Sequence, residues 1–235
     1  MTDTLQFSVE AAPDFPLLRV QLAAGQQVLA EPSAMATMAP NIQLKSGVKG
    51  GLGKGLGRML GGESFIVNTF TAEGAPGEVC FAAGGLGDLV HYRLSGAGLM
   101  LQRGAFLAQS HGVDVSASWQ GAKGFFSGQG LVMLKATGAG DLFFTSYGAI
   151  LPMEVDGQLL VDTGYIVAFE DTLSYRITTV PGSRPGAGGK LKSFFFGGEG
   201  LVCELTGRGR AWVQTRQVAS YLGWVYPFRP AKKKG

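Results

Sequence analysis

One phrase occurs twice in this chain: two phenylalanines, then two glycines separated by one residue, then two aliphatic residues. The copies span residues 125–132 and 195–202, so they start 70 residues apart, at Phe125 and Phe195. A degenerate third copy lies at residues 61–67. Repetition at a regular spacing indicates one supersecondary unit used several times. The repeat therefore constrains the architecture before any single residue is considered, and it predicts related β-units in tandem.

Shorter matches extend the repeat at offsets of 60 and 132: residues 104–108 with 164–168, Gly25 with Gly157, and Ala36 with Ala168. They predict three units: about 61–118, 125–180, and a split unit made of 195–216 and 17–43. For the split unit to be complete, the N-terminal strands must pair beside the C-terminal ones, within the chain or by exchange between subunits. We therefore expect a closed pseudo-threefold structure or a swapped oligomer. The expected domains are 1–118, with the N-terminal strands and a glycine-rich loop, and 119–235, with the C-terminal half-repeat and a basic tail.

Short apolar runs bounded by glycines favour an all-β chain. Glycine supplies 38 of the 235 residues, and the glycines recur at turn spacing, which predicts tight turns with positive φ. Asp156-Gly157 is a strong hairpin signal. Two stretches depart from the β pattern. Residues 48–60 carry an aliphatic residue at every fourth position, and residues 218–225 favour a short helix.

Charge and cysteine content bear on the oligomeric state, the partners and the cellular location of the protein. Only 16% of residues are charged, which leaves much neutral surface and favours a homo-oligomer, with a trimer as the expected form. The net charge of +3 does not indicate nucleic acid. No apolar run has the length of a signal peptide or a membrane span, so we expect a cytoplasmic protein, peripheral to the membrane if it binds one. Cys80 and Cys203 lie in strand-like segments and are expected to be buried thiols.

The search for catalytic chemistry yields no convergent set. The two histidines, His91 and His111, lack the spacing of metal ligands and are expected on a strand surface and in a turn. No nucleophile elbow or phosphate-binding loop motif is present. Asp162, Glu170 and Asp171 flank one predicted strand pair, and Asp156 lies in the turn expected before it. We therefore expect no catalytic residue, metal or cofactor, and the chain is predicted not to be an enzyme.

The candidate binding segment is the glycine-rich basic stretch before the first phenylalanine-glycine copy. Its cations are Lys49, Lys54 and Arg58. Its aliphatic residues are Val48, Leu52, Leu56 and Leu60. Such a segment can lie shallowly at an anionic interface. In the alternative interpretation, the aliphatic residues pack on the β-core and the cations are merely solvated.

Residues 101–108, 161–170 and 198–216 resemble, in that order, the family named for altered inheritance of mitochondria, member twenty-four. The resemblance extends from about Leu17 to Phe228. It implies tandem β-domains similar to the trp RNA-binding attenuation protein, built as short jelly-roll-like double-stranded β-helices with exchanged N-terminal segments. Family members in mitochondria are associated with inner-membrane organisation, a role that reaches this chain only by analogy. One departure is Gln129, where the family pattern expects a glutamate. The family implies no catalytic residue.

The leading hypothesis is therefore a non-enzymatic, homo-oligomeric β-scaffold that binds a partner protein or an anionic membrane surface. The first alternative is RNA or DNA binding, but aromatic residues do not interleave with the basic segments as single-stranded nucleic acid requires. The second alternative is an enzyme or a small-ligand pocket, for which the sequence offers no convergent polar set.

Overall fold

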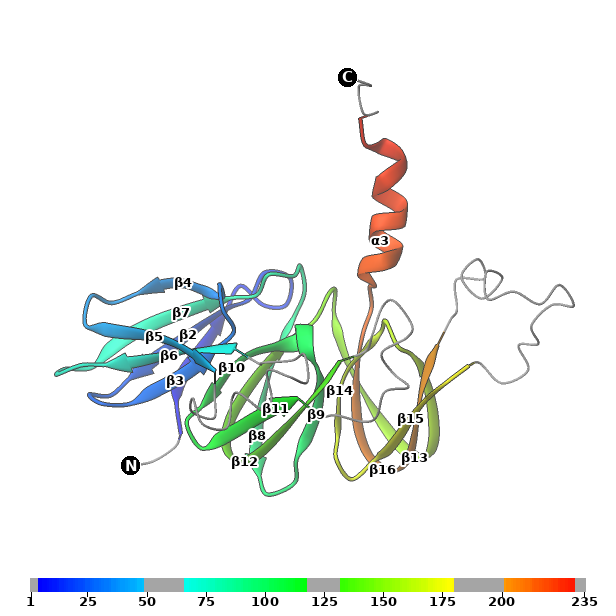
Figure 1. Cartoon of the computed structure of the whole chain (residues 1–235), viewed down its shortest axis with the longest axis horizontal. Coiled ribbons are helices and arrows are strands. Elements are labelled where there is room, and N and C mark those ends of the chain that lie inside the picture. The colour runs from blue at the N-terminus through cyan, green and yellow to red at the C-terminus, as the bar shows by residue number, and fades with distance from the viewer. Residues whose placement is uncertain (1–3, 49–65, 118–131, 180–200, 231–235) are drawn as a thin grey trace, which may run out of the picture.

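The computed structural model describes residues 4–48, 66–117, 132–179 and 201–230, and these ranges are mostly antiparallel β-structure. Three β-units follow one another along the chain and lie in a row (Figure 1). The all-β class predicted from the sequence is confirmed. The repeated phrase itself lies almost wholly outside the described residues.

The first unit has six strands: β2 (Leu17–Leu22), β3 (Gln27–Ala30), β4 (Met35–Met38), β5 (Ile42–Val48), β6 (Ile66–Ala72) and β7 (Gly77–Ala82). β7 pairs with β2 and β4, and β6 pairs with β3 and β5. A further strand, β1 (Gln6–Glu10), pairs with the outer edge of β2. Leu18, Val20 and Leu22 alternate with more exposed residues along β2, as expected of a strand with one face on the core.

The second unit repeats this scheme with β8 (Leu89–Ser95), β9 (Leu99–Gln102), β10 (Phe106–Ser110), β11 (Val113–Ala117) and β12 (Met133–Thr145). A 3-10 turn, η1 (Arg103–Ala105), joins β9 to β10. The first half of β12 pairs with β9 and β11, and its second half pairs with β8 and β10. One long strand therefore takes the places that β6 and β7 hold in the first unit.

The third unit uses two long strands, and its elements are β13 (Ile150–Asp162), β14 (Ile166–Glu170), β15 (Ser174–Thr178) and β16 (Val202–Gln214). β16 pairs with β13 along its whole length, with β15 in its first half and with β14 in its second half. The chain then forms α3 (Val218–Val225) and the 3-10 turn η3 (Tyr226–Phe228). The helix predicted at residues 218–225 is confirmed.

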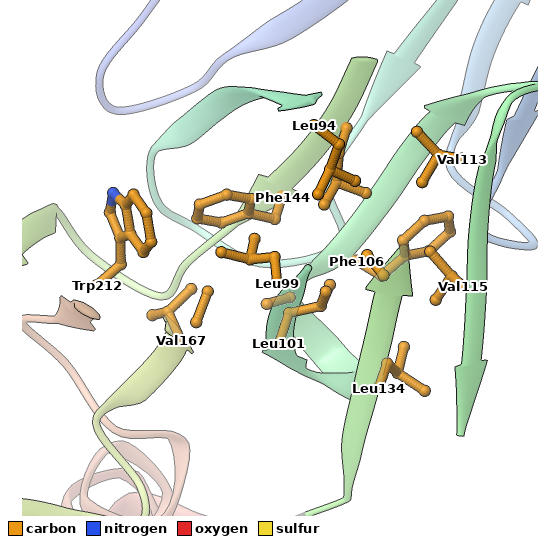
Figure 2. Packing of buried hydrophobic residues seen from close by; sticks show 14 of the residues in the cluster. Leu94, Leu99, Leu101, Phe106, Val113, Val115, Leu134, Phe144, Val167 and Trp212 are labelled. Carbon is orange, nitrogen blue, oxygen red and sulfur yellow. The ribbon is translucent and has the colours of Figure 1, made fainter. Parts of the chain in front are cut away.

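Strand pairs also join the units to one another. β3 of the first unit pairs with β10 of the second, and β9 of the second pairs with β14 of the third. The junctions have apolar side chains as well. Trp212 of β16 lies edge-on to Phe144 of β12, with ring centroids 5.7 Å apart, inside the core cluster of the central unit (Figure 2). Each fully buried phenylalanine or leucine contributes about 1.5–3 kcal/mol, so the junctions add to stability as the unit interiors do.

Some glycines predicted to lie in turns between strands lie inside strands instead. Gly138 and Gly157 have the expected positive φ values, +97° and +107°, but they lie inside β12 and β13 instead of ending strands. The prediction of a hairpin turn at Asp156-Gly157 is wrong, because Gly157 pairs with Gly207 in the middle of the β13–β16 ladder. The unbroken ladder determines the local structure, and the glycine provides a bend within the strand.

The predicted completion of a split third unit within the chain is also wrong. Residues 17–41 form β2, β3 and β4, which pair with β6, β7 and β10, and within the described ranges none of them pairs with β16. The N-terminal segment therefore completes the first unit, not the C-terminal one. The expected domain boundary after residue 118 falls between β11 and β12, which pair from Val113 opposite Gly138 to Ala117 opposite Leu134. The units run over 17–82, 89–145 and 150–214, because the first and last strands of the first unit pair with each other, as do those of the other two.

Candidate functional site

The C-terminal helix is the element least supported by the rest of the protein. It begins after Gln217, whose backbone carbonyl accepts the Tyr221 amide at 3.1 Å and whose side-chain amide oxygen accepts the Ser220 hydroxyl at 2.8 Å. Pro227 cannot continue the helix, and the chain turns into η3 there. None of its eight residues is buried, and it has no side-chain N-cap. A helix this short is marginal in water without packing.

The outer surface of α3 and η3, residues 218–228, is rich in aromatic side chains and is called the C-terminal helix surface below. Its exposed large hydrophobic residues are Val218, Tyr221, Leu222, Trp224, Tyr226 and Phe228. Trp224 and Phe228 are 66% and 76% exposed, which is far more than a core side chain tolerates. The helix stands away from the three units (Figure 1).

The aromatic rings form a chain from the β-units toward the tip of the helix. Tyr147, in the loop after β12, lies 5.9 Å from Tyr221, which lies 6.1 Å from Trp224. Trp224 in turn lies 5.9 Å from Phe228, measured between ring centroids. The Arg229 guanidinium lies over the Tyr226 ring at 5.3 Å. These contacts hold the rings in place while leaving their outer faces open to solvent.

The charged residues of the C-terminal part of the sequence all have one sign. After Glu204 the sequence contains no acidic residue, and it contains seven basic ones: Arg208, Arg210, Arg216, Arg229, Lys232, Lys233 and Lys234. Arg208 and Arg210 pair with Asp156 and Glu154 on β13, so they belong to the third unit. The lysine run lies outside the described residues. An exposed aromatic helix that leads into a basic tail is the combination expected at an anionic interface.

A cleft of about 570 Å³ lies between the units and the base of α3. Its lining includes Glu31, Gln102, Thr145, Ser146, Gln214 and Gln217. Several of these polar groups already have partners within the protein. The Gln214 side chain bonds the Tyr147 amide and the Gly164 carbonyl, and the Ser146 hydroxyl bonds the Gly148 carbonyl. Burial raises the pKa of Glu31, although nearby Arg103 partly opposes this. Polar side chains that line the cleft are thus used mainly in hydrogen bonds that hold the protein together.

A second polar cluster surrounds Asp141, whose side chain is only 2% exposed. Its carboxylate accepts the Leu5 amide at 2.7 Å, contacts His91 Nε2 at 2.8 Å and pairs with an Arg93 guanidinium nitrogen at 3.0 Å. Burial alone would raise the pKa of Asp141, but these three bonds outweigh burial and hold the pKa below its usual value. Phe7 of β1 lies 4.5 Å from the His91 ring. The cluster therefore ties the N-terminal segment to the second unit, a structural task.

The predicted binding segment falls mainly between the described ranges 4–48 and 66–117. Lys49, Leu52, Lys54, Leu56, Arg58 and Leu60 lie outside the described residues. Val48 is the last residue of β5, where it pairs with Ile66 of β6. The predicted role of this segment therefore stays a prediction.

The carboxylates singled out in the sequence do not converge. Asp162 accepts the Gly164 amide at 2.8 Å, Glu170 accepts the Arg210 amide at 3.0 Å, and Asp171 accepts the Gly98 amide at 2.9 Å. Each carboxylate holds a turn or a neighbouring strand. Within the described ranges, no group of three or more potential ligands is arranged to hold a metal ion.

Both cysteines are buried, as predicted, and desolvation raises the pKa of Cys203 to about 12. His111 lies in an exposed turn, as expected. His91 lies on β8, also as expected, but its bond to buried Asp141 was not foreseen, because the two residues are 50 positions apart.

Together, the fold and this surface define a tandem antiparallel β-protein with a protruding aromatic helix. Among the described residues, no helix is both long and apolar enough to cross a membrane. The family model described as "Mitochondrial biogenesis AIM24" matches residues 7–216, and the chain belongs to this family. The family resemblance seen in the sequence is thereby confirmed.

Two comparisons with single proteins agree with the family match. An uncharacterised protein of Streptococcus pyogenes serotype M6 is 26% identical over 237 residues, which cover 96% of this chain and 92% of the relative. A crystal structure of a Streptococcus pyogenes protein superposes with a TM-score of 0.79 at 24% identity. It covers 96% of this chain and 100% of that one, and at this identity it supports the fold alone. The likeness to the trp RNA-binding attenuation protein stays a prediction.

Proposed function

We propose that this protein is a non-enzymatic β-scaffold that associates with itself and docks on an anionic membrane surface through the C-terminal helix surface. The observation that carries the proposal is the set of exposed aromatic side chains on residues 218–228, next to a chain end that contains only basic charges. A partner protein is the other occupant that the sequence allowed, and the experiment below separates the two.

The energetics of the surface favour a lipid interface. Tryptophan and tyrosine are enriched at the boundary between lipid headgroups and hydrocarbon, where the ring is apolar and its edge is polar. Each basic residue near an anionic membrane adds about 1 kcal/mol, screened by salt. Arg229 follows directly on Phe228, so cation and apolar anchor are adjacent in the chain. Insertion would also supply the packing that the eight-residue helix lacks.

The non-enzymatic part of the proposal is supported by how the titratable side chains are used. Asp141, Asp162, Glu170 and Asp171 hold backbone amides or basic side chains in place. A general acid or base must instead be free to exchange a proton with a substrate. Self-association is supported by the low charged fraction of 16%, well below the usual ~25%.

Replacing Trp224 and Phe228 with serine is expected to lower binding to anionic vesicles by about tenfold or more, because each buried aromatic ring contributes about 1.5–3 kcal/mol. The measurement is vesicle flotation with equal parts of phosphatidylglycerol and phosphatidylcholine, against phosphatidylcholine alone. The melting temperature should stay unchanged, because neither ring is buried in the protein.

The matched control is Phe15→Ser, because Phe15 is 71% exposed but lies in the loop between β1 and β2, far from α3 along the chain. It should bind vesicles like the parent. Flotation that is unaffected in the Trp224→Ser, Phe228→Ser variant would contradict docking through this surface. If K49E/K54E/R58E alone abolished flotation, the predicted glycine-rich segment would be the docking site. Absence of flotation by the parent would leave a partner protein as the occupant and overturn the membrane proposal.

A further inference from the structure

The two junctions between units are built in the same way. In each, the strand in the second position of one unit, β3 or β9, pairs antiparallel with the strand in the third position of the next unit, β10 or β14. At the first junction, Gln109 of β10 lies opposite Leu29 of β3. At the second, Phe169 of β14 lies opposite Met100 of β9. All four side chains are at most 5% exposed. Adjacent units are therefore joined, at both junctions, by a buried antiparallel strand pair.

The first unit has its own copy of the strand that β10 and β14 contribute, and this copy is β4. Each of the three strands carries a register shift at the same place: Met35/Thr37 in β4, Phe106/Ala108 in β10 and Ile166/Ala168 in β14. Counting from that irregularity, Met38 occupies the position of Gln109 and Phe169. β4 pairs only with β7 among the described strands, so its other edge is open there.

The third unit has its own copy of the strand that β3 and β9 contribute, and this copy is the second half of β13. Along it, Leu159 and Val161 turn toward the core of the third unit, as Leu99 and Leu101 of β9 turn toward the core of the second. Leu160 lies between them and corresponds to Leu29 and Met100. Within the described residues, β13 pairs only with β16.

Exposure distinguishes these two end strands from their buried counterparts. Met38 is 41% exposed and Leu160 is 40% exposed, although the corresponding residues of the two internal junctions are at most 5% exposed. The other open edges do not show this contrast. β5, β11 and β15 have one described partner each, so an open edge at their position is a property of every unit. Among the described strands, β8 and the first half of β13 lack the β1-like partner of β2, and at the junction positions only β4 and the second half of β13 lack a partner that their equivalents have.

We propose that β4 of one copy pairs with the second half of β13 of another copy, continuing the internal junction from chain to chain. This deepens the self-association in the proposed function and rests on it. By the register of the internal junctions, Met38 lies opposite Leu160 of the second copy, with Thr37 opposite Val161. The central unit separates β4 from β13 in one chain (Figure 1), so the partner edge comes from a second copy. The contact is head-to-tail, and it closes into a ring or continues as a filament.

Two single variants and their mixture test this inference. Met38→Lys places a charge on the β4 edge, and Leu160→Lys places one on the β13 edge. Both sites are half-exposed in one chain, so each variant should keep the parental melting temperature. In the contact, however, each lysine would be buried against an apolar residue of the other copy, and Glu204, which lies opposite residue 160, is already paired with Arg176. Light scattering at micromolar concentration should therefore give a single chain of 24.6 kDa for each variant and a larger species for the parent.

The mixture of the two variants carries the sharpest outcome. M38K keeps an intact β13 edge and L160K keeps an intact β4 edge, so an equimolar mixture should form a species of two chains and nothing larger. Leu44→Lys on β5 is the control, because Leu44 is 39% exposed on an edge that is open in every unit, and its mass should match the parent.

Parental mass for both edge variants would overturn the β4–β13 contact while leaving self-association through another surface. A parent of 24.6 kDa would overturn self-association itself, whatever the vesicle experiment shows. A mixture that stays at one chain would also contradict the head-to-tail pairing.

Discussion

Replacing Asp141 with alanine is expected to lower the free energy of unfolding by about 3 kcal/mol, because it removes the shared acceptor of a buried polar cluster. The change leaves the Leu5 amide without its bond and leaves Arg93 and His91 without their anion. The two basic side chains are partly exposed, 44% and 31%, which keeps the estimate at the low end for a broken buried pair. Urea unfolding at neutral pH, followed by tryptophan fluorescence, measures the loss.

The pH dependence of stability should reveal the same carboxylate. Its pKa is lower in the folded protein than in the unfolded chain, where the usual value is about 3.9. Its contribution is therefore fully present above that unfolded value and is lost as the pH falls through the lower folded value. Asp141→Asn should keep one acceptor oxygen, lose less stability than Asp141→Ala at neutral pH, and show a shallower acid limb. An alanine variant as stable as the parent would show that the cluster contributes nothing.

Replacing Gly138 with alanine is expected to cost about 3 kcal/mol, from two sources that add. The φ of +97° disfavours any residue with a Cβ, at about 1–3 kcal/mol for such a backbone. A Cβ at this position would also lie 2.3 Å from the backbone carbonyl oxygen of Gly112, which has no flexible end that could move aside. Thermal and urea unfolding of the variant would measure the sum.

Gly157→Ala is the matched control for that prediction. Its φ of +107° is similar, but a Cβ there meets nothing within 4 Å. It should cost only the conformational part, about 1–2 kcal/mol less than Gly138→Ala. Equal losses for the two variants would show that the close approach of Gly112 to β12 does not constrain the fold.

The sequence predicts much of the local structure correctly. Alternating apolar residues and recurring glycines indicated an all-β chain, and the stretch 218–225 indicated the helix that is present. Strand-like surroundings placed both cysteines in the interior. These signals succeed because each depends on a short window, in which burial on one face imposes a period of two or 3.6 residues.

Those local signals could not show at which residue each repeated unit begins. A periodic pattern gives the length of a unit but not the residue at which it starts, and the most conspicuous phrase lies almost wholly outside the described residues. The start depends on which strands pair, for example Leu17 of β2 with Ala82 of β7, at a separation that no local window covers. Asp156-Gly157 failed for a related reason, because thirteen paired positions between β13 and β16 outweigh one dipeptide preference.

The surfaces proposed for docking were largely missed at the sequence level. Four aromatic residues within eight positions, Tyr221 to Phe228, followed by three lysines, are a readable signal, but buried core strands of this chain are also rich in aromatic residues. Only the structure shows that these rings are exposed. Met38 and Leu160 carry no signal at all, because their exposure is unusual only when compared with the buried residues of the internal junctions.

The claim at the centre of this account is that the row of three units ends in two complementary strand edges that pair between copies. Amide hydrogen exchange of the unmodified protein, measured across a dilution series, tests it most directly. The account predicts that peptides covering β4 and the second half of β13 lose protection together on dilution, while those covering β11 and β15 do not change. Protection of β4 and β13 that is independent of concentration, or that changes in only one of the two strands, would contradict it.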